Sequence, residues 1–234
     1  MMWLQHPFSV SATLERSVVL TYAVDPDQAA ARLPAPLQLD LYQGHAFCAA
    51  ALAQTRGLRP SSLHSFFGRD FVLAGYRLFV KHTRGHRTRR GLYILRSETN
   101  SRWMRVLGDL LTAYRYRHVD IEFQDQRITS LQTGLEIRYE ANGEASLPEE
   151  SPFPDWDQAR AYAGPMPYTF SVHGRTVLSV RGHRSAWSPR PLQVHHAQIP
   201  FLRESGFERA KLANAFIVDN VPYRWDRGVR EPWD

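Results

Sequence analysis

Two arginines and a glutamate on neighbouring predicted strands have the chemistry to bind a small anion. Arg77 falls in the apolar segment 71–80, and Arg96 and Glu98 fall in the segment 91–98. The two segments flank a basic turn, so we expect a long β-hairpin. Arginine recognises carboxylate and phosphate through paired N–H donors. The residue types therefore predict an anion pocket on one face of this hairpin.

The register of the hairpin decides whether these three side chains meet. If Lys81 pairs with Leu92, Arg77 lies directly opposite Arg96, and Glu98 lies one pair further along. A slip of one residue moves side chains to the other face and destroys the arrangement. Two interpretations remain open: a pocket for a small anionic ligand, and a set of exposed cross-strand ion pairs.

Cys48, Lys81 and Glu98 are the weak candidates for catalytic chemistry. Cys48 is the only cysteine and lies in the small-residue segment 46–53. It could act as a nucleophile only beside a cation in a cavity, and a core position is the simpler interpretation. Lys81 stands next to the basic turn, near a solvent-exposed rim. The catalytic residues therefore stay unknown at this point.

The histidines do not predict a metal site. His82 and His86 flank a glycine-containing turn, which gives no helical face for two ligands. His195 and His196 point to opposite faces of an extended chain and lack a nearby cysteine or clear carboxylate. Phosphate-binding glycine loops, the dinucleotide fingerprint and the nucleophile elbow are absent from the sequence. We expect neither a metal nor a cofactor.

The elements that would position these residues are mostly short strands. A strand is expected at 14–24, followed by a short helix that Asp25 caps and Pro26 begins. The segment 100–111 has helical spacing, and 112–123 alternates like a strand that places Tyr114 and His118 on one face. Further strands are expected at the segments 134–141, 168–174 and 176–184. These elements predict one mainly antiparallel α+β domain spanning 1–234.

Composition places the chain among globular proteins of the cytoplasm. It has 234 residues, 43% hydrophobic and 22% charged, which suits a single large domain. One cysteine excludes an intrachain disulfide and favours a reducing compartment. The N-terminal segment lacks the features of a signal peptide, and the longest apolar run is too short to cross a bilayer. We expect no membrane association.

The net charge of +6 raises a second possibility, a polyanion binder. Lys81 and Lys211 are the only lysines, so arginine supplies nearly all of the positive charge. The basic segment 81–91 and the tyrosines beside Arg115 and Arg117 could contact nucleic acid. However, strand alternation separates these arginines from the tyrosines, and no nucleic-acid-binding motif is present. Nucleic acid is therefore the less favoured partner.

Three segments in sequence order resemble the acetoacetate decarboxylase-like superfamily. They are "VVLTYAVDPDQAAARLPAPLQLD" at 18–40, "GLYILRSETNSR" with the following "LGDLLTAY" at 91–114, and "HRSAWSPRPLQ" at 183–193. The middle segment is most similar to the uncharacterised bacterial YqjF-like branch. The resemblance covers roughly residues 14–225. It implies a cone-shaped, mainly antiparallel β-barrel with a few short helices and an internal ligand cavity.

The chemistry of the resembling decarboxylases does not transfer to this chain. They use a lysine that forms a Schiff base, and a second lysine lowers its pKa. The lysine pair should fall around Asp109 to Tyr114, where this sequence has none. One family acid falls near Cys48 and another in the loop 61–64, which has no carboxylate. The family's first-strand arginine falls next to Arg16, so a guanidinium could survive there.

The sequence thus favours a cavity protein that binds or converts a small anionic or carboxylate metabolite without a Schiff-base lysine. The expected ligand-binding residues are Arg16, Arg77, Arg96, Glu98, Tyr114 and His118. Whether a reaction is catalysed stays open. The alternatives are a non-catalytic structural relative, which could form homo-oligomers, and the polyanion binder.

Overall fold

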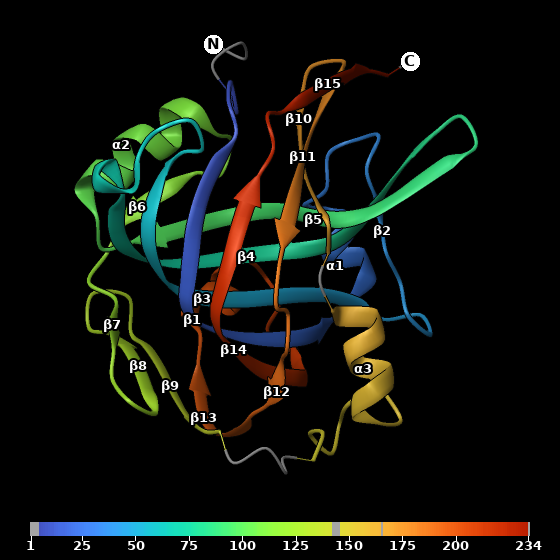
Figure 1. Ribbon diagram of the computed structural model, residues 1–234. Helices are drawn as coiled ribbons and strands as arrows, with labels where there is room; N and C mark the ends of the chain where they lie inside the picture. Colours follow the sequence, from blue (N-terminus) through green and yellow to red (C-terminus); the bar gives the residue numbers. More distant parts are fainter. Residues whose placement is uncertain (1–4, 142–145, 165, 234) are drawn as a thin grey trace.

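A computed structural model describes residues 5–141, 146–164 and 166–233, and most of them lie in strands (Figure 1). The helices are α1 (Pro26–Ala30), α2 (Arg102–Leu111), α3 (Trp156–Ala163) and α4 (Pro200–Glu204), with a 3-10 turn η2 (Ser65–Phe67). The strands are β1 (Val10–Val24), β2 (Gln38–Leu39), β3 (Ala46–Pro60), β4 (Arg69–Arg84), β5 (Arg87–Thr99), β6 (Tyr116–His118), β7 (Glu122–Phe123), β8 (Arg127–Ser130), β9 (Leu135–Glu140), β10 (Tyr168–His173), β11 (Thr176–Arg184), β12 (Arg190–Pro191), β13 (Gln193–Gln198), β14 (Lys211–Trp225) and β15 (Val229–Pro232).

Seven of these strands close into a ring. The order is β14-β1-β3-β4-β5-β10-β11, and β11 pairs back onto β14 from Gly182–Trp225 to Arg184–Tyr223. The neighbours in the ring are antiparallel except β5 and β10, which run parallel over three pairs. In Figure 1, β1, β14 and β11 cross in front of β4 and β5. This arrangement confirms the predicted mainly antiparallel fold class.

A second, four-stranded sheet packs on the outer face of the ring. Its order is β13-β9-β8-β7. Ile137 of this sheet and Phe201 of α4 share a core cluster with Leu52 and Tyr76 of the ring. Burying these large apolar side chains between the layers is the main source of stability here. The opposite face of β3 and β4 looks into the ring.

Several local predictions are confirmed. Asp25 caps α1, accepting hydrogen bonds from the backbone N–H groups of Asp27 and Gln28, and Pro26 begins the helix. The helical spacing predicted over 100–111 corresponds to α2, and the structure adds that Ser101 caps this helix through the N–H of Met104. The predicted hairpin is β4–β5, which reverses at Gly85 with φ of +56°, a conformation that suits glycine.

The predicted continuous strand over 112–123 is wrong. Only Tyr116–His118 and Glu122–Phe123 are strands, and they belong to different sheets. Arg115 has φ of +54°, which interrupts an extended chain. The Asp120 carboxylate accepts from Ser130 Oγ at 2.6 Å, at the crossing between the sheets. The alternation in the sequence therefore reflects two short strands, β6 and β7, preceded by a kink in the backbone at Arg115.

The described residues contain no helix long and apolar enough to span a membrane. Within the same ranges, no group of three or more histidine, cysteine or acidic side chains is arranged to hold a metal ion.

Candidate functional site

A β-bulge in the β4–β5 hairpin separates the side chains that the sequence was expected to bring together. Arg96 pairs with Tyr76, but Arg77 pairs with Ile94, because Leu95 is an extra residue on β5. Lys81 pairs with Arg90 rather than with Leu92. The predicted register is therefore wrong. Arg96 lies on the outer face of the ring, and Arg77 lies on the inner face.

Arg96 and Glu98 form a compact ionic cluster on the outer face. Arg96 Nε lies 3.2 Å from Glu98 Oε1 without good hydrogen-bond geometry, and Arg96 Nη1 donates to Glu204 Oε2 at 2.8 Å. The Tyr76 hydroxyl donates to Glu98 Oε2 at 3.0 Å. The Arg96 guanidinium also lies 4.4 Å from the ring centroid of Phe201. Both oxygens of Glu98 are thus used inside the protein.

An outer pocket of about 330 Å3 adjoins this cluster. It is lined by Tyr76, Arg96, Glu98, Arg117, His118, Val119, Gln132, Thr133, Pro200, Phe201 and Glu204. Burial raises the pKa of Glu98, while the Arg96 charge and the Tyr76 hydrogen bond lower it. His118 lines the pocket as well, so the structure brings three predicted ligand-binding residues together here. Their charges are nevertheless balanced by one another.

Arg77 lies inside the ring with a second arginine, Arg184 of β11. Burial is the main cause that lowers the pKa of Arg77; the Tyr223 phenol opposes this, and the Arg184 charge lowers the pKa further. β4 is not a neighbour of β11 or β14, so these groups approach one another across the interior. The Arg184 guanidinium lies 4.6 Å from the Trp187 ring and 5.1 Å from the Tyr223 ring.

This interior cluster contains more hydrogen-bond donors than partners. Arg184 Nη2 donates to the Met166 carbonyl and to the Tyr223 hydroxyl, each at 3.0 Å. Within the described ranges, Arg77 Nε, Arg184 Nε, Arg184 Nη1 and Trp187 Nε1 are buried without a hydrogen-bond partner. In that same part of the chain, no carboxylate lies within ion-pair distance of either arginine. Buried donors of this kind require an acceptor.

Two tyrosines from the α2–β6 connection complete the interior cluster. Tyr116 packs on Gly108 of α2, where a Cβ atom would clash with its ring, and its N–H donates to Asp109. Burial raises the pKa of Tyr114, and neighbouring tyrosines raise it further. Burial likewise raises the pKa of Tyr116. Both phenols therefore stay protonated near neutral pH and can donate hydrogen bonds.

A second cavity, of about 400 Å3, borders Tyr114 from the outside. It lies where β5 and β10 part, because their parallel pairing ends at Tyr93 and Phe170. The next residues, Ile94 and Ser171, line the cavity together with the α2–β6 connection. Of the interior cluster, this cavity contacts Tyr114, and neither Arg77 nor Arg184 lines it.

The other predicted site residues lie elsewhere. Arg16 is half-exposed, 3.5 Å from Asp219, and donates to the Asp125 carbonyl at 3.4 Å. Cys48 is fully buried in the outer core, and burial raises the pKa of its thiol to about 12, which suits a core residue. Lys81 pairs with Gln38 near the hairpin turn.

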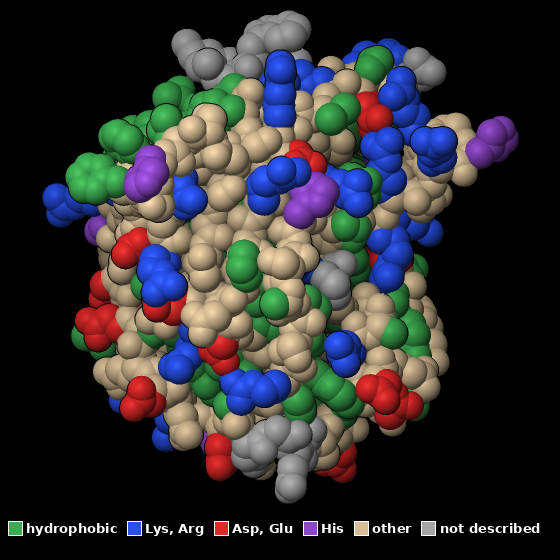
Figure 2. All heavy atoms as spheres, viewed as in Figure 1, with side chains coloured by type: hydrophobic (Ala, Val, Ile, Leu, Met, Phe, Trp, Pro, Cys, Tyr) green, Lys and Arg blue, Asp and Glu red, His purple; other side chains and the backbone are tan. Residues whose placement is uncertain are grey.

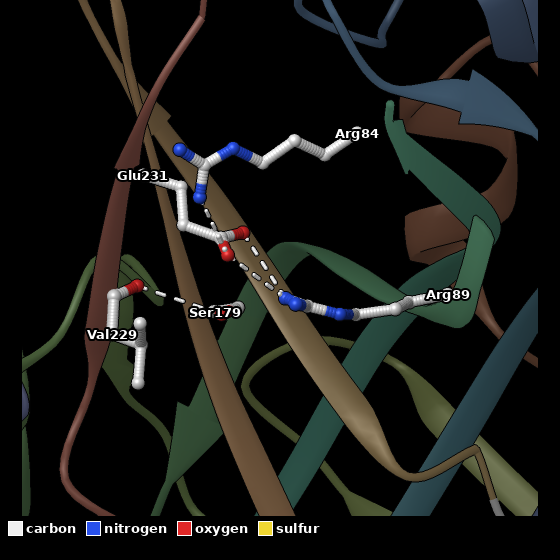
Figure 3. Close-up of polar contacts among 5 residues, drawn as sticks. All are labelled: Arg84, Arg89, Ser179, Val229 and Glu231. Atoms are coloured by element: carbon white, nitrogen blue, oxygen red, sulfur yellow. Dashed lines mark hydrogen bonds and ion pairs between the residues drawn. The ribbon is translucent and has the colours of Figure 1, made fainter. Parts of the chain in front are cut away.

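The basic hairpin uses part of its charge to hold the C-terminal strand. Arg84 Nη1 donates to Glu231 Oε1 at 3.2 Å, and Arg89 Nη1 donates to Glu231 Oε2 at 3.0 Å, as Figure 3 shows. Arg90 Nε donates to Asp40 Oδ2 at 2.5 Å. Basic side chains gather around the hairpin at the upper right of Figure 2, with acidic ones among them.

Sequence reasoning missed Arg184, Trp187 and Tyr223. A sequence signal could have indicated two of them, because Arg184 and Trp187 belong to the segment 183–193 that carries the family resemblance. Nothing in the sequence indicates that β11 pairs with β14 and brings this segment to Arg77. Tyr223 gave no signal, since it follows a proline in a segment of unassigned structure.

Comparison with known proteins places the chain in a family. A family model named DUF2071, described as an uncharacterized conserved protein (COG2071), matches residues 11–222. The chain belongs to this family. The match agrees with the predicted likeness to the YqjF-like branch. A comparison with curated proteins found no match.

Solved structures of acetoacetate decarboxylase-like proteins share the fold. An acetoacetate decarboxylase-like enzyme from Sphingomonas wittichii RW1 has a TM-score of 0.59 at 13% identity, covering 96% of this chain and 92% of that one. Acetoacetate decarboxylase from Legionella pneumophila has a TM-score of 0.57 at 11% identity, covering 95% and 86%. The enduracididine biosynthesis enzyme MppR complexed with pyruvate has a TM-score of 0.53 at 10% identity, covering 96% and 89%. At these identities the likeness concerns the fold.

Proposed function

We propose that this protein binds a small carboxylate or related anion inside the ring, between Arg77 and Arg184. The observation that carries the proposal is the set of buried guanidinium and indole donors without acceptors in the described chain. A carboxylate supplies two acceptor oxygens in a plane, which matches the donor fork of arginine. Tyr114 and Tyr223 add hydroxyl groups at the same place.

The fold and the second cavity support this location. In this proposal the ligand enters where β5 and β10 part, because the cavity there is lined by Tyr114 of the interior cluster. A protein of similar fold, MppR, is described in complex with pyruvate, which is a carboxylate. The outer pocket is the weaker candidate, because Arg96 already has Glu98 and Glu204 as partners.

The proposed binding does not involve a Schiff base. The two lysines of the chain are Lys81, near the hairpin turn, and Lys211, whose ammonium group lies 2.5 Å from Glu150. Arginine stays protonated and forms no ordinary imine. Borohydride reduction in the presence of a β-keto acid, followed by mass analysis, should leave both lysines unmodified. An adduct on Lys81 would contradict this part of the proposal.

Ligand-observed NMR or calorimetry with butyrate tests the binding itself. We expect saturable binding to the wild-type protein and at least about a tenfold weaker affinity for Arg77→Met, which removes a charged donor. Arg190→Met is the matched control, because Arg190 is exposed and binds Asp219 on the outside. Equal butyrate affinity in all three proteins would overturn the proposal, and so would the absence of wild-type binding to butyrate, succinate and methyl phosphate alike.

A further inference from the structure

The charge of the interior cluster indicates the class of anion that it takes. Arg77 and Arg184 bring two positive charges into the ring, and the tyrosines around them stay neutral. We propose that the ligand is a dianion, either a dicarboxylate or a phosphoryl monoester. This inference rests on the proposed function, because it concerns the same site.

Hydrogen bonding alone would not separate a dianion from a monoanion. The four unpartnered donors, Arg77 Nε, Arg184 Nε and Nη1 and Trp187 Nε1, could all be accepted by one carboxylate, which has about four lone-pair positions. Charge makes the distinction. Arg77 and Arg184 are half-buried, with the Nε atoms of both buried, so a single carboxylate leaves one of two guanidinium charges uncompensated in a partly desolvated interior, which is costly.

Two other charged side chains of low exposure in the described residues have partners of opposite charge, in contrast to the interior pair. Glu231, whose side chain is 7% exposed, has Arg84 and Arg89 as partners (Figure 3). Arg96, whose side chain is 11% exposed, has two carboxylates. The same rule applied to the interior leaves a deficit of two negative charges in the described chain. A dianion fills it.

Succinate and butyrate form a matched pair of ligands for the test, because both have four carbons and differ by one carboxylate. We expect wild-type protein to bind succinate at least about tenfold more tightly than butyrate in calorimetry at fixed ionic strength. Methyl phosphate is the test ligand that represents phosphoryl monoesters. If it binds more tightly than succinate, the ligand is a phosphoryl monoester; if more weakly, a dicarboxylate.

The variants Arg77→Met and Arg184→Met test the origin of the preference. Each should reduce the succinate-to-butyrate ratio of affinities to near one, because one positive charge remains. Circular dichroism checks that both variants fold, and thermal stabilisation of the wild type by each ligand gives a measurement independent of the variants. If butyrate binds as tightly as succinate and methyl phosphate, the dianion proposal fails while the proposed function stands. If none of the three binds, both fail.

An independent observation concerns an apolar patch on the surface. It consists of six exposed side chains, Leu63, Phe66, Phe67, Trp103, Val106 and Leu110, on the η2 loop and α2. Helix α2 lies at the upper left of Figure 1, where Figure 2 shows hydrophobic side chains, and Phe71, four residues after Phe67 of η2, packs against Met104 of α2. With about 200 Å2 for a large side chain, the exposed fractions amount to about 700 Å2.

We propose that this patch binds a second copy of the chain. A patch of this size exceeds the usual range for a monomer, about 300–600 Å2, and fills most of the roughly 800 Å2 that each partner buries in a standard interface. Trp103, Val106 and Leu110 form one stripe along α2, with Arg102, Arg105 and Asp109 beside it. Antiparallel packing of α2 on its symmetry mate brings these arginines near the other copy's Asp109, so the surface is self-complementary.

Sedimentation velocity over a range of protein concentrations tests the dimer. We expect the wild type to dimerise and Val106→Asp to remain monomeric at the same concentrations. Leu131→Asp is the control, because Leu131 is 93% exposed on the β8–β9 turn, outside the patch. A monomeric wild type, or a dimer that Val106→Asp leaves intact, would overturn the proposal. A monomer that co-sediments with anionic vesicles would overturn it in favour of a lipid surface.

Discussion

The outer pocket around Arg96 and the interior cluster around Arg77 are both built on strands β4 and β5. They differ in whether the arginine has a carboxylate partner. Arg96 has Glu98 and Glu204 within ion-pair distance and Tyr76 completing the hydrogen bonds of Glu98. Arg77 and Arg184 have no carboxylate in the described part of the chain. Both clusters contain tyrosine and arginine, so residue type does not distinguish them.

The two clusters show how a structural ion cluster differs from the proposed binding site in this protein. In the outer cluster the protein supplies both signs of charge, so the geometry is complete without a ligand. In the interior cluster four donors are left without an acceptor in the described chain, and in our proposal a bound anion supplies the missing acceptors and charge. The contrast can be tested by removing one arginine from each cluster.

The largest effect is expected for Arg96→Met. Glu98 is 2% exposed and would keep its buried charge with one partner removed, so we expect a loss of about 3 kcal/mol in the free energy of unfolding. Chemical denaturation measures it. The double variant Arg96→Met, Glu98→Gln should recover much of this loss, since no unpaired charge remains. If the single variant loses less than about 1 kcal/mol of unfolding free energy, the Arg96 cluster is not a structural ion cluster, and its contrast with the interior cluster does not hold.

A smaller effect, of opposite sign, is expected for Arg184→Met in the absence of ligand. The variant removes one of two like charges from the interior, so the free energy of unfolding should stay equal or rise by about 1 kcal/mol. Thermal denaturation in a buffer without carboxylate or phosphate measures this change. A destabilisation as large as that of Arg96→Met would mean that Arg184 is a structural residue.

The smallest expected effect is the contribution of Glu98 to the pH dependence of the free energy of unfolding. Burial raises the pKa of Glu98 above 4.5 in the folded protein, so the native state binds its proton more readily than the unfolded state. Its contribution to stability is therefore present below pH 4.5 and is lost as the pH rises through the folded pKa. The difference in unfolding free energy between wild type and Glu98→Gln should accordingly fall as the pH rises across this window. If the difference in unfolding free energy grows with pH instead, burial does not raise the pKa of Glu98 in the folded protein.

The sequence predicted more of the fold than of the site. Hydrophobic alternation and turn residues located the hairpin, the helix cap at Asp25 and the helix within 100–111, and three sequence segments indicated the family. Arg96, Glu98 and His118 were predicted and do lie together, at the outer pocket. Arg77 was assigned to the same pocket and lies on the other face. Single-residue irregularities such as the bulge at Leu95 leave no mark in the pattern of residue types.

The residue types limit the chemistry that is possible, because the chain has abundant arginine, two lysines outside the expected position and one cysteine in a small-residue strand. Which arginines have a carboxylate partner depends on the three-dimensional arrangement of the strands. Pairing of β11 with β14 brings Arg184 across the ring to Arg77, and the bulge turns Arg96 away from both. The face of a strand on which a side chain lies follows from the local alternation of residues. Contacts across the ring depend on the order of the strands, which no local sequence pattern encodes.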